Sequence, residues 1–212
     1  MIVTGAGRAF SAGGDIDEMQ GHDALDYYRR LAEPVHRLFN RLEALELPTI
    51  AAVNGPALGG GAELLLTLDL RLLAEGVCFG LPEIKMGLFP GAGGTQRLIR
   101  QMPVCRAREL LFTGDSLSAE DAVAIGLANR VVPHGQLLEE ARALALRMVA
   151  QSPLALRLLK RTIADGTEMP LAAALRHEQA MIGLAMESNE ARKGLASFLE
   201  RRAAESGRGQ NK

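Results

Sequence analysis

The sequence predicts an α/β fold followed by an all-helical region, and two patterns lead to this prediction. Up to Pro133, short apolar runs alternate with glycine-rich turns and a long helical pattern, which is typical of an α/β core. After Pro133 the strand patterns stop and only helical patterns follow. We therefore expect a mixed core over residues 1–133 and a helical region over residues 134–212.

Within the first region, three apolar runs predict buried strands at residues 2–4, 49–53 and 70–74. A helix is expected between the first two strands, at residues 24–45. Its predicted apolar stripe consists of Leu31, Val35, Leu38, Leu42 and Leu45. Pro34 lies inside this segment, so we expect a kink or a new helix start there.

The helical region contains four helical patterns, at residues 136–150, 153–164, 170–186 and 189–204. Pro153 and Pro170 stand at or near two of the predicted starts, where the missing amide hydrogen of proline costs little. The apolar faces of these helices need a partner. We expect that partner to be the core, a neighbouring subunit, or both.

Composition excludes several classes of protein. The chain has 212 residues, of which 24 are basic and 25 acidic, so it carries no charge pattern for nucleic acid or an anionic membrane. No apolar run reaches membrane-spanning length, and no signal-type segment opens the chain. Cys78 and Cys105 are far apart, which favours reduced thiols in a cytoplasmic protein. The four histidines lack ligand spacing, so no metal site is expected.

The first candidate motif is the glycine triplet Gly59, Gly60 and Gly61, followed by Glu63 in an apolar helix start. Glycines let a backbone approach a ligand, and the first turn of a helix offers free N–H groups that stabilise a developing oxyanion. A carboxylate among leucines tends to be desolvated, so we expect Glu63 to have a raised pKa and to be suited to carry a proton. The alternative is a first-turn Glu favoured by the helix dipole, with the glycines serving packing.

The second candidate motif spans residues 79–96 and carries Glu83 in an apolar loop bounded by prolines and glycines. Such a loop holds a side chain rigidly, so Glu83 is a second candidate proton carrier. The alternative is a solvated loop glutamate paired with Lys85, because loop carboxylates are usually exposed.

The third motif, residues 5–16, supplies small residues whose backbone N–H groups could face a ligand. It does not match a dinucleotide fingerprint, because Gly5 and Gly7 are followed by Phe10 and no β–α–β spacing is evident. Ser11 lacks the G-x-S-x-G frame of a serine hydrolase. We expect Asp15 to cap a helix or turn.

Together these motifs resemble the enoyl-CoA hydratase/isomerase (crotonase) family, collinearly over nearly the whole chain. The family's F-x-A-G-x-D pattern is similar to residues 10–15, and its A-x-N-G-x-A-x-G-G-G-x-E-L pattern to residues 52–64. Its F-x-x-P-E-x-x-x-G-x-x-P-G-x-G-G-T-Q-R-L pattern is similar to residues 79–98. Later matches lie at residues 111–115, 122–132 (with Ala128 where a β-branched residue is usual) and 198–202.

The resemblance implies a crotonase-like spiral of ββα units, truncated at its N-terminus, followed by a helical trimerisation region. It implies hydration of a 2-enoyl-CoA, with Glu63 and Glu83 as catalytic residues and the amides of Ala12 and Gly60 as an oxyanion hole. Many isomerases of the family keep only the glutamate that matches Glu83, so an isomerase is the alternative. The implied substrate-binding residues are Ala12, Gly13, Gly14, Asp15, Ile16, Gly59, Gly60 and Gly91.

The resemblance also implies a homotrimer or homohexamer that acts on an acyl-CoA thioester without a metal or redox cofactor, since CoA is part of the substrate. It begins at Met1, in what is an internal strand of the family, and the family's preceding strand pair and helix have no counterpart. We therefore expect this chain to be less stable and less active than a form with that segment. An inactive truncated member of the family is the further alternative.

Overall fold

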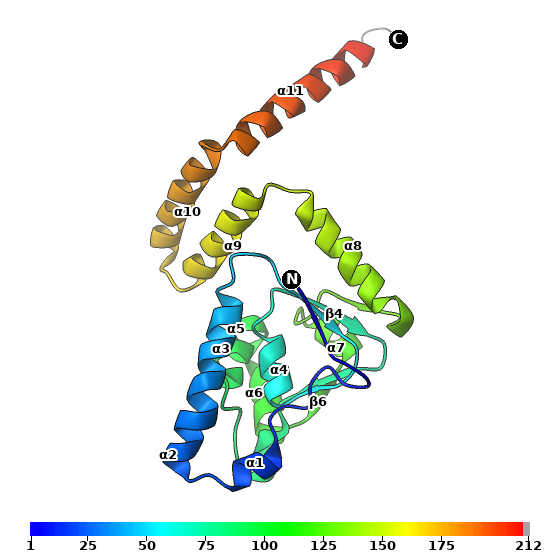
Figure 1. Ribbon diagram of the computed structural model, residues 1–212. Coiled ribbons are helices and arrows are strands. Elements are labelled where there is room, and N and C mark those ends of the chain that lie inside the picture. Colours follow the sequence, from blue (N-terminus) through cyan, green and yellow to red (C-terminus); the bar gives the residue numbers. More distant parts are fainter. Residues whose placement is uncertain (210–212) are drawn as a thin grey trace. The chain divides into compact units, whose positions relative to one another are not determined.

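The computed structural model describes residues 1–209, with side chains through residue 202, and these residues form two compact units. The first unit spans Met1–Leu146 and is mixed α/β, whereas the second begins at Arg147 and is helical (Figure 1). The strands of the described chain end at Val132, next to the predicted change at Pro133. Helix α8 (Leu137–Val149) follows, and most of it belongs to the first unit.

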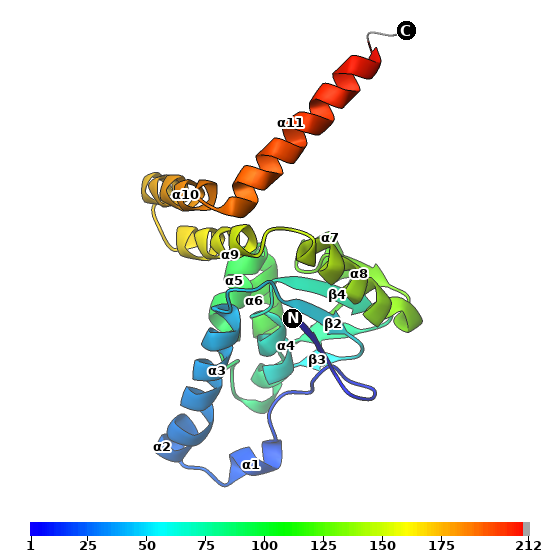
Figure 2. The same cartoon turned by 45° about the horizontal axis from the view of Figure 1, so that its top comes forward.

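A four-stranded parallel sheet forms the centre of the first unit (Figure 2). Its strands lie in the order β1 (Ile2–Thr4), β2 (Ile50–Val53), β4 (Leu70–Ala74) and β7 (Arg130–Val132). All four residues of β2 are buried, which explains its continuous apolar run. The three predicted strands are therefore present, but the prediction that the first is buried was wrong. Strand β1 lies at the edge of the sheet, where Ile2 and Val3 are half-buried and Thr4 is exposed.

Another expectation about this sheet was wrong. The sequence indicated no β–α–β spacing after the first glycine loop, but β1 and β2 pair in parallel with helices between them. The long loop that follows β1 separates the strand from its crossover helices, so the local pattern does not reveal the connection. The dinucleotide fingerprint remains absent from the sequence.

A smaller sheet contains β3 (Ala57–Leu58), β5 (Cys78–Gly80) and β6 (Ser116–Ser118), in that order. Strands β3 and β5 are parallel, whereas β5 and β6 are antiparallel. A parallel bridge between Ser11 and Ala57 joins the third motif to β3. Strands of two or three residues are too short to show alternation, so the sequence did not predict them.

The predicted helix at residues 24–45 consists of α2 (Ala24–Tyr27), a π-helical turn η1 (Tyr28–Ala32) and α3 (Glu33–Glu43). Pro34 is the second residue of α3, just past the π turn, and lacks an amide hydrogen for the regular helical bond, which agrees with the predicted break. The predicted apolar stripe is wrong at Leu38, which is 53% exposed, whereas its neighbour Phe39 is only 7% exposed. The extra residue of a π turn rotates the positions that follow it around the helix axis.

Seven short helices surround the sheets and carry the motif residues. They are α1 (Ile16–Gln20), α4 (Gly60–Leu65), η2 (Pro82–Met86), α5 (Gly94–Gln101), α6 (Val104–Thr113), α7 (Ala119–Ala124) and η3 (His134–Gln136). Helix α4 packs against α5, and η2 packs against α6. The core between these elements contains the fully buried side chains Ile50, Leu65, Leu66, Leu68, Leu72, Leu81 and Leu98.

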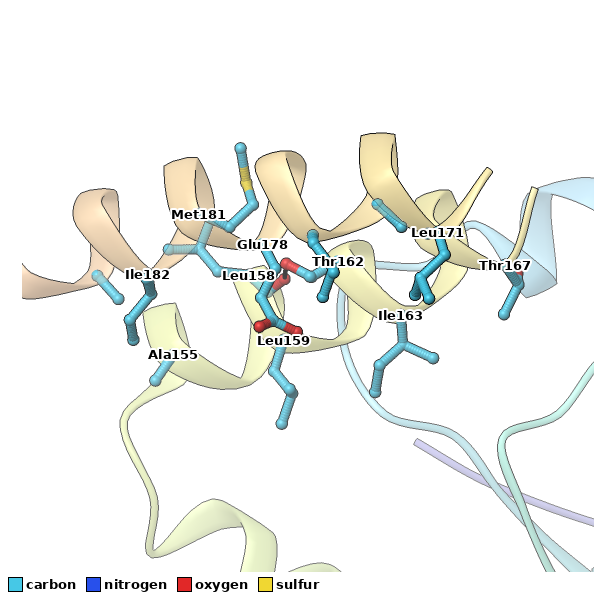
Figure 3. A pocket seen from close by; sticks show the side chains of 14 residues that line it. Ala155, Leu158, Leu159, Thr162, Ile163, Thr167, Leu171, Glu178, Met181 and Ile182 are labelled. Atoms are coloured by element: carbon cyan, nitrogen blue, oxygen red, sulfur yellow. Dashed lines mark hydrogen bonds between the residues drawn. The ribbon is translucent and has the colours of Figure 1, made fainter. Parts of the chain in front are cut away.

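The second unit contains α9 (Pro153–Thr167), α10 (Leu171–Met186) and α11 (Asn189–Gly209), which match the predicted helices to within a few residues at each end. Helices α9 and α10 pack on each other around a largely apolar hollow of about 690 Å³ (Figure 3). Leu159, Ile163, Leu171 and Ile182 are among its lining residues. Within the described residues, no helix is both long and apolar enough to cross a membrane.

Candidate active site

Glu63 lies in the first turn of α4, and the glycines before it place this turn against Glu83. Gly59 is the N-cap of the helix and adopts a φ of 53° and a ψ of −128°, a conformation that L side chains rarely adopt. A Cβ on Gly59 would lie 3.2 Å from Oε1 of Glu83. The glycine therefore allows the turn at the start of α4 and the close approach of the second glutamate.

The Glu63 side chain is buried, with only 3% of the residue exposed. Its Oε1 accepts hydrogen bonds of 2.7 Å from the amide nitrogens of Ala92 and Gly94. Burial raises the pKa of Glu63, and the two amides, together with the nearby charges of His36 and Arg97, oppose this effect. The prediction of a desolvated carboxyl among leucines is therefore supported. Glu63 also lies in the first turn of α4, as the helix-dipole reading expects.

The segment that binds Glu63 is fixed by contacts with α3. His36 Nε2 lies 2.8 Å from the carbonyl oxygen of Gly91, and Arg97 donates a 3.1 Å bond to the carbonyl of Ala92. The same guanidinium donates to Asn40 Oδ1 and Glu43 Oε2 on α3, at 2.7 and 2.8 Å. These bonds hold the carbonyls of Gly91 and Ala92, so the neighbouring amides face Glu63.

Glu83 lies in η2 and is half-buried. Its Oε2 is buried, and no hydrogen-bond partner for it occurs among the described residues. Burial raises the pKa of Glu83, and the charge of Glu63 raises it further. Lys85 forms its 3.3 Å ion pair with Asp115. The alternative of a solvated Glu83 paired with Lys85 is therefore wrong.

The loop that contains Ala12 lies against the start of α4. Gly13 has a φ of 100°, and a Cβ on it would lie 2.9 Å from the amide nitrogen of Gly60. Within residues 1–209, the amides of Ala12 and Gly60 donate to no protein acceptor. Two free N–H groups on adjacent segments are the arrangement that an oxyanion hole needs.

Backbone contacts fix the register of this loop. Phe10 and Ser11 donate their amides to the carbonyl of Pro56, at 3.1 and 3.2 Å, and Leu58 donates to the carbonyl of Ser11 at 2.9 Å. A Cβ on Gly61 would lie 2.3 Å from the carbonyl oxygen of Ser11. Gly61 is therefore a packing position, as one reading of the triplet suggested, while Gly59 and Gly60 face the site.

Asn54 holds the base of the same loop. Its Oδ1 accepts a 2.9 Å bond from the amide of Gly5, and its Nδ2 donates a 3.0 Å bond to the carbonyl of Gly7. One side chain thus satisfies backbone groups on both sides of the turn that follows β1. This role was not predicted, because nothing local to Asn54 identifies partners almost 50 residues away.

The other candidate substrate-binding residues occupy different environments. Gly14 and Ile16 are exposed, and Asp15 caps α1 by accepting bonds from the amides of Asp17 and Glu18 at 3.0 and 3.4 Å. The predicted capping role of Asp15 is therefore confirmed. Gly91 directly precedes Ala92, whose amide binds Glu63, and the Gly91 carbonyl contacts His36. Substrate contact by these residues stays a prediction.

Ala92 and Gly94 were not among the predicted site residues, although both amides bind Glu63. Gly94 also has no room for a side chain, because a Cβ there would lie 2.9 Å from both Cγ and Oε1 of Glu63. A local signal was present. Two adjacent glycines directly before a helical pattern indicate a helix start with free amides, which are suitable partners for a carboxylate.

A buried and a half-buried carboxyl with raised pKa values, beside two free backbone amides, define a site for acid–base chemistry at a polarised carbonyl. Comparisons with known proteins agree with a site for this kind of chemistry. The sequence matches the enoyl-CoA hydratase/isomerase family over residues 1–207. The chain belongs to this family, and it is an enzyme.

Individual relatives are similar over most of the chain. The short-chain-enoyl-CoA hydratase of Clostridium acetobutylicum is 38% identical over 206 residues, which are 97% of this chain and 78% of the relative. The crotonyl-CoA hydratase of Syntrophomonas wolfei is 40% identical over 205 residues, 96% of this chain and 78% of the relative. The crystal structure of an enoyl-CoA hydratase from Bacillus anthracis matches with a TM-score of 0.90 at 39% identity, covering 94% of this chain and 78% of that one. The predicted family and crotonase-like fold are thereby confirmed.

Proposed function

We propose that this enzyme reversibly adds water to a 2-enoyl-CoA and gives a 3-hydroxyacyl-CoA. The observation that carries the proposal is the pair Glu63 and Glu83, both with a pKa raised by burial and close enough for one charge to affect the other. Addition of water across a double bond needs one group to accept a proton and one to deliver a proton. The names of the relatives, two of which are hydratases of short enoyl-CoA or crotonyl-CoA thioesters, support the same reaction.

In the proposed mechanism, the amides of Ala12 and Gly60 bind the thioester oxygen. Two donors at this oxygen polarise the carbonyl and stabilise the enolate-like state that forms when water adds to the β-carbon. The free amides and the tight approach of Gly13 to Gly60 support this role. These steps need no metal or redox cofactor, because the CoA thioester itself makes the carbonyl electrophilic.

The two glutamates take opposite proton roles. Glu63 receives two amide hydrogen bonds, which favour its charged form, so we assign it as the carboxylate that takes a proton from water. Glu83 has a buried oxygen without a partner and faces the charge of Glu63, so we assign the proton to Glu83. Glu83 then delivers this proton to the α-carbon. The two carboxyls titrate as a coupled pair.

An isomerase that shifts the double bond with Glu83 alone is the second candidate. The burial of Glu63 in direct contact with two amides favours the hydratase, because an isomerase using one glutamate has no need for a second desolvated carboxyl. Product analysis tests the choice. A hydratase converts a 2-enoyl thioester to the 3-hydroxy product, whereas an isomerase converts a 3-enoyl thioester to the 2-enoyl form. Absence of both products would favour the inactive alternative.

We also propose assembly as a trimer or a dimer of trimers through the second unit. Large apolar side chains of α9, α10 and α11 are exposed on the single chain; they include Leu159, Ile163, Leu171, Ile182, Leu184, Phe198 and Leu199. Contiguous exposed apolar surface is typical of protein interfaces. A cytoplasmic location stays a prediction from the sequence.

A further inference from the structure

Arg71 on β4 is a buried cation that the proposed chemistry does not use. Only 8% of the residue is exposed. Its guanidinium donates five hydrogen bonds, all to neutral oxygens within the described chain. The acceptors are the carbonyls of Leu65, Leu66, Leu68 and Leu127, at 3.0, 3.3, 3.0 and 2.9 Å, and Oε1 of Gln101 at 2.6 Å. Burial lowers the pKa of Arg71 to about 10, so the side chain stays protonated at neutral pH.

Three of these acceptors, Leu65, Leu66 and Gln101, lie at the ends of the two helices that form the site. Leu65 is the last residue of α4, and Leu66 is its C-cap. Gln101 is the last residue of α5, and its Nε2 donates a further 2.9 Å bond to the carbonyl of Leu66. Arg71 and Gln101 therefore join the C-terminal end of α4 to the C-terminal end of α5.

The opposite ends of the same helices carry the reactive groups. The first turn of α4 holds Gly60 and Glu63, and the first residue of α5 is Gly94, whose amide binds Glu63. Helices of six and eight residues are about 9 and 12 Å long at 1.5 Å per residue. Because such short helices are stiff, a displacement of one end moves the other end by a similar distance.

We propose that Arg71, acting through Gln101, is a positioning residue that sets the distance between Glu63 and the amide of Gly94. The expected effect on turnover rests on the proposed function, whereas the effect on the distance between Glu63 and the Gly94 amide does not. The last carbonyls of a helix have no partner within the helix, and a cation there stabilises them. A guanidinium can satisfy several such carbonyls at once, which a lysine amine cannot do in the same fixed geometry.

Gln101→Met is the main test, because it keeps the side-chain length and removes both bonds that Gln101 makes. Gln101→Glu is the partial rescue variant, since its carboxylate still accepts from Arg71 but cannot donate to the carbonyl of Leu66. Gln96→Met, an exposed position on the same helix, is the matched control. Arg71→Lys is a second variant, which keeps the positive charge and loses the planar set of guanidinium N–H donors. Circular dichroism and thermal melting identify which variants are folded.

The primary readout is the pKa of Glu63, measured by carboxyl carbon NMR titration, which does not require turnover. We expect the pKa to rise in Gln101→Met and in Arg71→Lys, because the Gly94 amide that opposes the effect of burial is moved away. We expect the kcat for crotonyl-CoA hydration to fall about 10- to 100-fold with a smaller change in KM, the cost of a displacement of about 1 Å. Gln101→Glu should recover part of both values, and Gln96→Met should match the wild type.

The outcomes separate the two proposals. A wild type without hydratase turnover contradicts the proposed function, and the NMR titration then still decides the role of Arg71. An unchanged Glu63 pKa in a folded Gln101→Met or Arg71→Lys protein overturns the positioning role. Equal losses of kcat in Gln101→Met and Gln101→Glu also overturn the positioning role, because only Gln101→Glu keeps the hydrogen bond from Arg71 to residue 101.

Discussion

Oε1 of Glu63 lies 2.7 Å from the amide nitrogen of Gly94, the residue at which helix α5 begins. The amide of Ala92 donates to the same oxygen at the same distance. A buried carboxylate is thus held at a helix start, where amides and the helix dipole favour negative charge. This relationship fixes the orientation of the carboxyl group that we assign as the base.

The fit between Gly94 and Glu63 leads to the first prediction. Gly94→Ala places a Cβ 2.9 Å from Cγ and Oε1 of Glu63, so the carboxyl group must move. We expect the kcat for crotonyl-CoA hydration to fall by about 100-fold, the usual cost of a displacement of about 1 Å. Steady-state kinetics measure the effect. Gly135→Ala, where a Cβ meets no atom within 4 Å, is the control and should behave as the wild type.

The second prediction concerns the two glutamates themselves. Glu63→Gln and Glu83→Gln keep the size of each side chain and remove its proton-transfer ability. Each general acid or base contributes about 100- to 10,000-fold, so kcat should fall by that order in both variants while the melting temperature stays close to that of the wild type or rises. Crotonyl-CoA turnover at saturating substrate is the measurement. Near-normal hydration of crotonyl-CoA by Glu63→Gln would exclude Glu63 as the base of the proposed mechanism.

The third prediction tests the proposed amide donor on Gly60. Gly60 is the first residue of α4, a position that tolerates proline, so Gly60→Pro removes the N–H with limited damage to the helix. Loss of one oxyanion-hole donor lowers kcat by about 100- to 1,000-fold. Gly60→Ala is the matched control, because it keeps the N–H and its Cβ would lie 3.5 Å from Cα of Gly13, an ordinary contact. Unaltered kinetics in a folded Gly60→Pro protein would exclude Gly60 from the hole.

The fourth prediction follows from the raised pKa of Glu83. A raised pKa means that the folded state holds the proton more tightly than the unfolded state, whose pKa is near the ordinary value of 4.5. The contribution of Glu83 to stability is therefore fully present below pH 4.5 and is lost as the pH rises through the folded-state pKa. Glu83→Gln removes this dependence, so its stability relative to the wild type should increase between pH 4.5 and pH 8.

Chemical denaturation across this pH range measures the difference in the free energy of unfolding. Glu75→Gln replaces an exposed carboxylate by the same amide and serves as the control, for which we expect little change with pH. A Glu83→Gln protein whose relative stability is constant or decreases over this range would show that burial of Glu83 does not oppose its ionisation.

The fifth prediction concerns assembly. Ile163 and Leu171 are 59% and 74% exposed and line the hollow between α9 and α10 (Figure 3). Ile163→Glu combined with Leu171→Glu places two charges in a proposed apolar interface, where unpaired charges are costly. Light scattering should show a trimer or hexamer for the wild type and smaller species for the double variant. Arg142→Glu, an exposed position on α8, is the control. A monodisperse wild-type monomer would contradict the proposal.

The sequence by itself determined the strands at the centre of the first unit and the helices of the second. Apolar runs located β1, β2 and β4, and β2 and β4 are mostly apolar because a central parallel strand is buried on both faces. The motifs around Glu63 and Glu83 identified the family and both candidate catalytic residues. These features could be predicted because they are encoded in neighbouring residues, whose spacing and composition directly reflect backbone conformation and burial.

Only the tertiary structure decided which groups meet. The amides that bind Glu63 come from residues 29 and 31 positions away, and Lys85 pairs with Asp115, not with Glu83. Arg71 reaches Leu127 and Gln101 from β4. The parallel pairing of β1 with β2 was likewise hidden behind a long connection. Such partners depend on how distant segments are brought together, and the energy of each contact is too small and too dependent on its surroundings to leave a local pattern in the sequence.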